Sequence, residues 1–386
     1  MKRTTMLGLC VGMVLAGFSA AWAAGPGDRA RVGAAAPATG GKHVDLVICL
    51  DTSNSMDGLI ASAKQKLWAV VNELATARPR PILRVGLYHY GNNGLDAKTG
   101  WVEKLCDLTD NLDGVYSKLF ALRTYGGTEY VARVVKAAVD EMGWNMDKGT
   151  LRVIFVAGNE PATQDATLKL QDVCKSAASR GIIINTIYCE YGATGEQGGW
   201  QDAARWADGQ YAAINADRGT VVVNSPYDKK LADLSVELNG TYVAFGAAGK
   251  DGARLQADME TAAGSMSPSA HAERAQAKAS GLYVNDAWDL VDAKTGGKVD
   301  LAKMDPNALP EKMRKMTPKE REAYVAGKAA RRDAIQKEIR DLSAKREAFV
   351  KEQVARQGLS EKQAFDAALR SAVRRQAEQK DFRFEK

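Results

Sequence analysis

Short apolar runs that alternate with helical segments constrain the fold of this chain more than any other feature. The first run, Val44 to Leu50, is almost continuously apolar, which is typical of a strand buried on both faces of a sheet. Strands that alternate with helices favour a parallel sheet, so we predict a doubly wound, mainly parallel α/β domain with helices on both faces. The other predicted strands are 82–90, 151–156, 182–189 and 241–245, and the predicted helices are 58–77, 119–142 (interrupted by a glycine turn), 164–179, 198–207 and 227–238.

The strand pattern ends near residue 248, and helical patterns dominate the rest of the chain. We therefore place the α/β domain at 44–248 and a mixed, partly helical linker region at 249–310. A basic, all-α extension follows at 311–386.

Two helix-start signals organise this extension. Thr317 and Glu320 form a capping box around Pro318, which predicts a helix of about forty residues that ends near Gly358. Ser360 opens a second capping box and predicts a last helix through residue 375. We expect the two helices to form a hairpin or a coiled-coil-like extension.

The N-terminal residues predict export. Lys2 and Arg3 precede an apolar run at 7–18, and Ala-Trp-Ala at 21–23 is the small-x-small pattern that a signal peptidase cleaves. The apolar run is shorter than the roughly 20 residues that span a bilayer. We expect 1–23 to be a signal peptide, 24–43 to be a flexible leader, and the mature protein to be periplasmic or secreted, without a transmembrane segment.

Export places four cysteines in an oxidising compartment, where disulfides are permitted. Cys174 lies late in a predicted helix and Cys189 ends the strand that follows, so we predict a Cys174–Cys189 disulfide. The alternative is that Cys49, Cys106 and these two are all buried as small hydrophobic residues.

The polar residues directly after the first strand are the strongest candidates for a site. Asp51, Ser53 and Ser55 bring one carboxylate and two hydroxyls to the carboxyl end of that strand, where ligands bind in open parallel sheets. Oxygen ligands suit hard divalent cations such as Mg²⁺. The same residue types also cap helices, which is the alternative interpretation.

A second loop strengthens the first interpretation. Tyr125-Gly126-Gly127-Thr128-Glu129 is a glycine turn that carries a threonine just before a helix. Together with the Asp51 loop it resembles the von Willebrand factor A domain over roughly 44–248. The resemblance implies a metal-ion-dependent adhesion site in which Asp51, Ser53, Ser55 and Thr128 hold Mg²⁺ or Mn²⁺ and a protein ligand supplies an acidic residue.

The chain departs from the family at one position. Where the family has an aspartate after the fourth strand, this chain has Ala157, followed closely by Asn159 and Glu160. Glu160 or Asn159 could replace the missing oxygen, the site could bind metal more weakly, or the metal could be lost while the fold is kept. We include Glu160 in the predicted set of metal ligands.

An enzyme is not expected. The three histidines, His43, His89 and His271, are scattered along the chain and suggest no nucleophile–base pair. Asp113 and Glu129 have no partner that we can place for paired-carboxylate catalysis.

The extension at 311–386 carries 21 Lys and Arg against 13 Asp and Glu, so the positive charge of the protein is concentrated there. These charges fit a solvated helix, contact with an anionic envelope surface, or binding of an acidic partner. Nucleic acid is not expected, because aromatic residues are not interleaved with the basic ones.

Two functions remain open. The leading hypothesis is an exported binding protein that mediates protein–protein interaction or adhesion through a degenerate metal site. The alternative is a metal-independent scaffold protein of the cell envelope that acts through its basic helices, which could also mediate oligomerisation.

Overall fold

The computed structural model describes residues 41–190, 198–215, 222–357 and 365–384. The predicted signal peptide, the leader up to residue 40 and the capping box at Ser360 lie outside these residues. No helix in the described ranges is long and apolar enough to cross a membrane.

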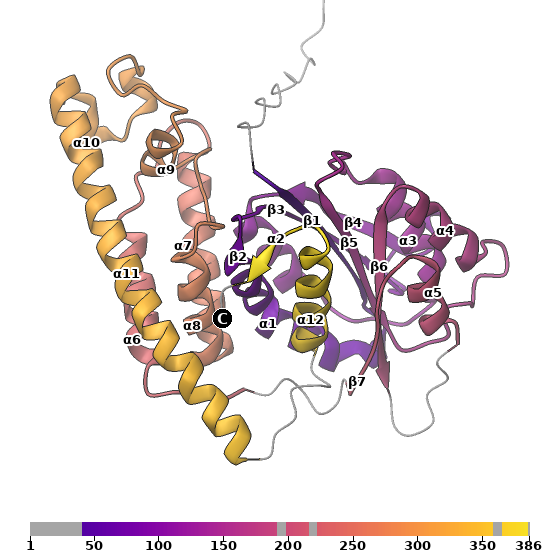
Figure 1. Ribbon diagram of the computed structural model, residues 1–386. Coiled ribbons are helices and arrows are strands. Elements are labelled where there is room, and N and C mark those ends of the chain that lie inside the picture. The colour runs from indigo at the N-terminus through magenta and orange to yellow at the C-terminus, as the bar shows by residue number, and fades with distance from the viewer. Residues whose placement is uncertain (1–40, 191–197, 216–221, 358–364, 385–386) are drawn as a thin grey trace, which may run out of the picture. The chain divides into compact units, whose positions relative to one another are not determined.

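A six-stranded sheet lies at the centre of the α/β part of the molecule (Figure 1). Its strand order is β4–β3–β1–β5–β6–β7, and all neighbours are parallel except β3 and β4. The predicted fold class is therefore confirmed, and the carboxyl end of β1 lies between those of β3 and β5. The strands are β1 His43–Asp51, β3 Ile82–Tyr90, β4 Val102–Thr109, β5 Leu151–Gly158, β6 Ile182–Glu190 and β7 Tyr211–Asn215.

Helices cover both faces of the sheet, which explains the continuous apolar runs of its central strands. Along β1, Leu46 and Ile48 enter the core beneath one set of helices, whereas Val47 and Cys49 enter the core on the opposite face. The first face is covered by α1 Asp57–Ala75, α2 Leu112–Ala121 and α12 Phe365–Glu378, and the second by α3 Val131–Glu141, α4 Leu170–Ser179 and α5 Trp200–Trp206.

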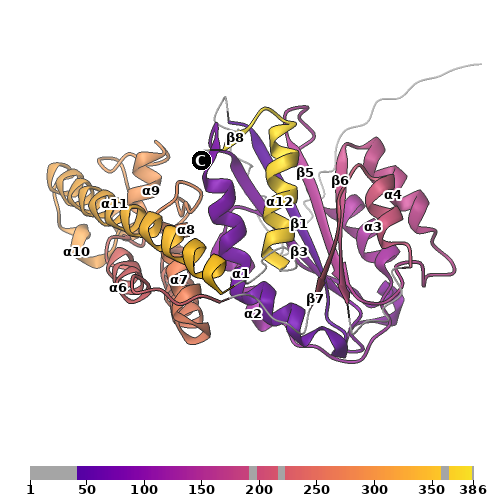
Figure 2. The same ribbon diagram turned by 60° about the horizontal axis from the view of Figure 1, so that its bottom comes forward.

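A separate group of helices, which we call the helical unit, packs beside α1 and α2 (Figures 1 and 2). Its longest member, α11, begins with the predicted capping box of Thr317 and Glu320. Ile335 and Ile339 of α11 pack against α6 and α8. The helical unit comprises α6 Asp228–Asn239, α7 Gly249–Met266, α8 Pro268–Lys278, α9 Leu290–Thr295, α10 Glu311–Arg314 and α11 Pro318–Arg356. Short elements complete the described chain: β2 Ala77–Arg78, β8 Arg383–Phe384, and the 3-10 helices Asn54–Met56, Ala97–Thr99 and Pro306–Ala308.

The last helix, α12, does not pair with α11, so the predicted hairpin is wrong. Leu369 and Val373 of α12 are fully buried in the core beneath α1, and β8 pairs with β2 at the end of α1. Figures 1 and 2 both show α12 beside α1 and against the sheet. The apolar residues of α11 pack against α6 and α8 instead.

Two other predictions are wrong, and two strands were missed. The segment 241–245 is not a strand: it forms only an isolated bridge between Ala244 and Asp289, and the Val243 N–H donates to the side chain of Asp289. Strands β4 and β7 were not predicted, since β4 is an edge strand with several exposed or half-exposed residues and no continuous apolar run.

The predicted Cys174–Cys189 disulfide is also wrong, because all four described cysteines are free thiols. Cys189 points to the sheet face covered by α1 and α12, whereas Cys174 lies in the core on the opposite face. The sheet itself separates the two sulfur atoms.

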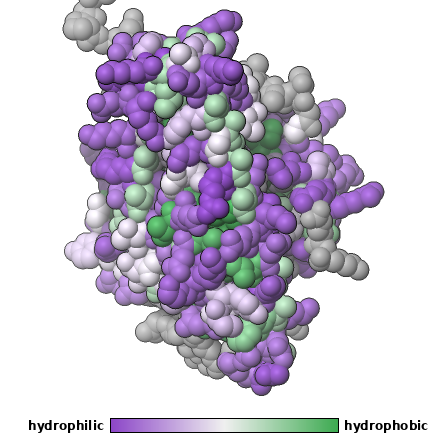
Figure 3. All heavy atoms as spheres, turned by 90° about the vertical axis from the view of Figure 1, so that its left-hand side faces the viewer, coloured by the Kyte–Doolittle hydropathy of each residue, from purple (hydrophilic) through white to green (hydrophobic). Residues whose placement is uncertain are grey.

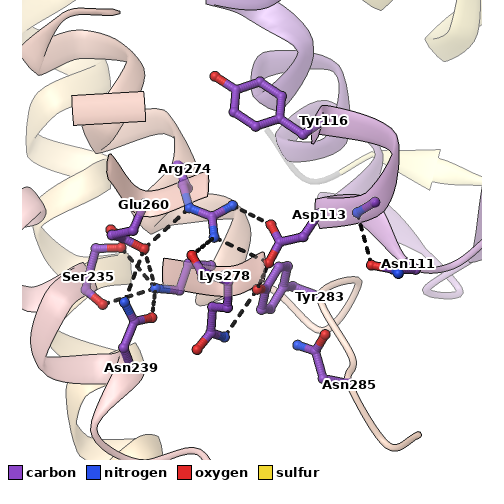
Figure 4. Close-up of polar contacts among 12 residues, drawn as sticks. Asn111, Asp113, Tyr116, Ser235, Asn239, Glu260, Arg274, Lys278, Tyr283 and Asn285 are labelled. Atoms are coloured by element: carbon purple, nitrogen blue, oxygen red, sulfur yellow. Dashed lines mark hydrogen bonds and ion pairs between the residues drawn. The ribbon is translucent and has the colours of Figure 1, made fainter. Parts of the chain in front are cut away.

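A buried polar network joins the helical unit to the six-stranded sheet and its covering helices, which we call the sheet domain (Figure 4). Arg274 of α8 is fully buried and donates to both carboxylate oxygens of Asp113 on α2, with Nη1 2.5 Å from Oδ1. Its Nε lies 3.2 Å from Glu260 of α7, which also accepts from Lys278 at 2.8 Å. The Tyr283 hydroxyl donates to Asp113. Each charge in this junction network therefore has an opposite charge in direct contact.

Candidate functional site

Asp51, the last residue of β1, is fully buried at the carboxyl edge of the sheet. Its Oδ1 accepts a hydrogen bond from the Ser53 N–H at 2.8 Å. Its Oδ2 is buried and has no hydrogen-bond partner among the described residues. A buried carboxylate oxygen without a donor is costly, so this atom indicates a place for a cation or a donor group.

The two predicted serines lie together and connect this loop to the end of β5. Ser53 Oγ and Ser55 Oγ are 3.1 Å apart, and Ser55 Oγ lies 3.3 Å from Oδ1 of Asn159. Ala157 packs into the hydrophobic core. The end of β5 therefore reaches Ser55 through the amide oxygen of Asn159.

A second carboxylate, Glu129, lies beside Asp51, although it was not among the predicted metal ligands. Glu129 Cγ and Asp51 Oδ1 are each 2.7 Å from the position that a Cβ atom on Gly91 would occupy. Gly91 has a φ of +72°, so glycine is favoured there for its backbone as well as for the space it leaves. The only sequence signal for Glu129 was its place directly after Thr128.

Burial and like charges control the ionisation of this site. Burial raises the pKa of Asp51 well above its usual range, and the nearby charges of Glu129 and Glu160 raise it further. Burial and the charge of Glu160 raise the pKa of Glu129 to about 7, against the opposing effect of its hydrogen bonds to Ser53 and Gln164. A bound cation would favour the ionised form of both carboxylates.

The other two predicted ligands contribute less. Thr128 is half-buried next to Glu129, and it makes no side-chain hydrogen bond within the described ranges. Glu160 is exposed and influences the site through its charge, while its backbone oxygen accepts a hydrogen bond from the indole of Trp200 at 2.8 Å. The structure thus brings Asp51, Ser53 and Ser55 together, whereas no side-chain hydrogen bond within the described ranges joins Thr128 or Glu160 to them.

Backbone hydrogen bonds fix the glycine loop above the site. The Tyr125 N–H donates to the Thr52 oxygen at 2.9 Å, and the Asn54 N–H donates to the Gly126 oxygen at 2.8 Å. The Gly126 N–H donates in return to Oδ1 of Asn54. Tyr125 itself is 60% exposed, which makes it the most exposed large hydrophobic side chain of the described residues. The loop is therefore held in place while an aromatic ring beside the site faces solvent.

A threonine, a histidine and a glutamate form a chain next to the site. Thr52 Oγ1 lies 3.0 Å from His89 Nδ1, and His89 Nε2 lies 2.8 Å from Glu103. The Thr52 side chain is completely buried, and its hydroxyl donates to the Tyr90 oxygen. A substrate could not reach this hydroxyl, so the arrangement is suited to holding the Asp51 loop against β3 and β4.

The donor set fits a hard divalent cation. Two carboxylates, two serine hydroxyls and the half-buried Thr128 offer only oxygen atoms, and Mg²⁺ and Mn²⁺ accept such ligands with retained water. No group of three or more histidine, cysteine, aspartate or glutamate residues that could hold a metal occurs in the described part of the chain. A cation here would therefore depend on the hydroxyls and on water as well as on carboxylates.

Comparison with known families agrees with this geometry. Residues 45–202 match the family model described as the von Willebrand factor type A domain. The chain carries a VWA domain. The matched residues include Asp51, Ser53, Ser55 and Thr128, and no curated protein matches the chain.

Solved structures with some likeness to the chain include other VWA proteins. A conserved hypothetical protein, BatB from Bacteroides thetaiotaomicron, is 14% identical over 58% of this chain and 98% of its own, with a TM-score of 0.34. The SpRpn10 VWA domain is 17% identical over 45% of this chain and 89% of its own, at 0.36. Proximal thread matrix protein 1 from the mussel byssus, described with a zinc-occupied MIDAS motif, is 12% identical over 46% of this chain and 43% of its own, with a TM-score of 0.37. These scores are too low to support an argument, so the VWA assignment rests on the family model.

The basic residues of the extension form a less open surface than the sequence suggested. Arg332 is buried between Asp289 and Asp292, at 2.8 and 2.6 Å, and Arg346 is buried against Asp228 at 2.7 Å. The outward face beside α11 is still mainly hydrophilic (Figure 3). Part of the positive charge therefore stabilises the helical unit and is not available to an external anion.

Proposed function

We propose that this protein binds a protein partner through a divalent cation held at the carboxyl edge of its VWA domain. The observation that carries the proposal is the buried carboxylate of Asp51, whose Oδ2 has no donor among the described residues and whose Oδ1 lies beside the buried side chain of Glu129. Mg²⁺ or Mn²⁺ would supply the positive charge that this pocket lacks and leave a position for an acidic side chain of the partner.

Each residue of the site would have a separate role in binding the cation or the partner. Asp51 and Glu129 would provide the two carboxylates, so that Glu129 takes the role that Ala157 cannot fill. Ser53 and Ser55 would provide hydroxyl oxygens, with Thr128 at the periphery and Asn159 orienting Ser55. Glu160 would act through its charge. Tyr125 would offer an exposed, rigidly held aromatic ring to the partner, as is common at the centres of protein interfaces.

The signal-peptide pattern at 1–23 supports a further part of the proposal, that the protein is exported and acts as a binding module in the periplasm or outside the cell. A metal-independent scaffold role is the second candidate. The inward-facing arginines of α11 weaken it, because they reduce the charge that an envelope surface would meet.

Titration of the full chain with Mg²⁺ and Mn²⁺ by calorimetry tests the cation site. The full chain is needed because α12 completes the core beneath α1. We expect saturable binding that is lost in Asp51→Asn and weakened about tenfold or more in Glu129→Gln, since hydrogen bonds and ion pairs to charged groups are worth about 1.5–3 kcal/mol.

Two control variants make the result specific. Glu160→Gln should weaken binding much less than Glu129→Gln, and Asp202→Asn on the exposed surface of α5 should leave it unchanged. If Glu160→Gln causes the larger loss, Glu160 and not Glu129 replaces the missing aspartate. The absence of saturable binding by the wild-type chain would contradict a cation-dependent function and favour the scaffold role.

A further inference from the structure

A cavity of about 680 Å³ opens where the helical unit meets the sheet domain. Its walls come from the end of α1, the segment after β2, the end of α8, and parts of α9 and α11. Ligand sites are common at junctions of this kind, and the volume is within the range of small-molecule sites. None of the cation-site residues lines the cavity.

Two arginines from opposite walls converge on the end of α8. Arg80, from the sheet domain, lies over Gly281, and its guanidinium occupies the position that a Cβ atom on Gly281 would take. Arg340, from α11, donates from Nη1 to the Ala279 oxygen at 3.1 Å. Both side chains are exposed residues of the cavity wall, and each reaches the same three-residue segment, 279–281.

Neither arginine is neutralised by a carboxylate in the described part of the chain. Arg80 makes no hydrogen bond or ion pair there, and the Ala279 oxygen is the only described partner of Arg340. A guanidinium has five N–H donors, so most donors of both groups are available. Glycine at 281 leaves the space that the Arg80 guanidinium occupies.

The other charged residues of the cavity wall form no ion pair with Arg80 or Arg340 in the described part of the chain. A third arginine of the wall, Arg332, is already paired with Asp289 and Asp292. The only other acidic residue of the wall is Asp333, which forms no ion pair within the described ranges. The guanidinium groups of Arg80 and Arg340 are therefore not paired with the carboxylates of this wall.

We propose that this cavity, the arginine groove, binds a small multivalent oxyanion between Arg80 and Arg340. Planar guanidinium groups bind phosphate and carboxylate groups through paired N–H donors, and two of them on opposite walls favour a ligand with at least two anionic groups. Polyphosphates and polycarboxylates share this chemistry. Because one arginine comes from each part of the molecule, the ligand would link the helical unit to the sheet domain.

Calorimetric titration of the metal-free full chain with pyrophosphate and, separately, with citrate tests the proposal. Removing metal first avoids complexes between these anions and divalent cations. We expect saturable binding of at least one anion that becomes weaker as salt is added, and the arm that binds identifies phosphate or carboxylate as the preferred group. Arg80→Ala and Arg340→Ala should each weaken binding by about tenfold or more.

Arg205→Ala is the matched control, because Arg205 is an exposed arginine on α5, outside the groove. It should leave binding unchanged, and thermal unfolding should show that all three variants are folded. Failure of both anions to saturate, or equal losses in Arg80→Ala and Arg205→Ala, would overturn the proposal. An unfolding temperature of Arg340→Ala that is lower while anion binding is unchanged would also overturn it, since Arg340 would then serve only to cap α8.

Discussion

The cation site and the junction network both contain buried charges, but they differ in how these charges are compensated. At the cation site, Asp51 and Glu129 lie side by side and one buried oxygen has no donor. In the junction network, Arg274 and Lys278 contact Asp113 and Glu260 directly. Burial therefore raises the pKa values of Asp51 and Glu129 at the cation site. In the junction network, the opposite charges outweigh the effect of burial and lower the pKa of Glu260.

This difference indicates that the cation site is suited to binding a ligand, whereas the junction network holds the helical unit and the sheet domain together. Uncompensated carboxylates cost stability and are retained where a ligand can compensate them. Fully paired buried charges have no free group that could bind a ligand. Removal of one partner lowers the free energy of unfolding strongly, because it leaves the other charges buried without a partner. The contrast predicts opposite responses to mutation and to pH at the two locations.

The largest effect is expected from Arg274→Ala in the junction network. The substitution leaves Asp113 and Glu260 without their shared cation, so the free energy of unfolding should fall by about 3–5 kcal/mol. Urea denaturation of the full chain measures this change. Arg254→Ala, which removes an exposed pair with Asp251, should cost less than about 1 kcal/mol. Similar losses in both variants would show that the network contributes no more than a surface ion pair.

A somewhat smaller effect is expected at low pH. Burial raises the pKa of Glu260, but Lys278, His271 and Arg274 outweigh it and lower the pKa far below the usual range. The stability contributed by Glu260 is therefore present above its unfolded-state pKa near 4.5 and is lost as the pH falls below it. Urea denaturation of the wild type and of Glu260→Gln should be compared between pH 6 and pH 3. The difference between their free energies of unfolding should shrink by about 2–3 kcal/mol as the pH falls. Parallel curves would contradict this interpretation.

The cation site should respond to pH in the opposite direction. The pKa of Glu129 rises from its usual value near 4.5 to about 7 on folding, so the folded state retains a proton that the unfolded state has lost. The metal-free protein should therefore lose about 1–3 kcal/mol of stability as the pH rises from 4.5 to 7. Glu129→Gln should remove this slope. A slope that persists in the variant would assign it to other groups.

The smallest effect on stability is expected for Tyr125→Ala. The ring is 60% exposed, and the position of its loop depends on backbone hydrogen bonds, so the free energy of unfolding should change by less than about 0.5 kcal/mol. The affinity for Mn²⁺, measured by calorimetry, should also be unchanged. A loss of cation binding would show that the ring supports the site itself and does not only form its exposed rim.

Local sequence patterns predicted much of this molecule. The buried strands β1, β3, β5 and β6 and the long helix α11 follow from continuous apolar runs and a capping box, which depend on nearby residues. The Asp51 loop was found for the same reason, because its position after a buried strand fixes its place at the sheet edge. Strand β4 was missed since an edge strand lacks the apolar run.

The missed features depend on contacts between residues far apart in the chain. Nothing near residue 129 shows that Gly91 leaves room for Glu129 beside Asp51. The sequence pattern of α12 does not predict its position either, because its apolar stripe could pack on α11 or on α1 equally well. The disulfide prediction failed because closeness in sequence does not reveal which face of a strand a cysteine occupies.

The position of α12 has a consequence for the order in which the protein can fold during synthesis. Leu369 and Val373 complete the core beneath α1, and Phe384 pairs with Ala77, so the sheet domain recruits residues from both ends of the described chain. The six strands are all translated before residue 216, yet the apolar surface under α1 stays uncovered until α12 emerges. Until α12 docks, the domain therefore keeps an exposed hydrophobic face beneath α1, so its core is completed only with this C-terminal helix.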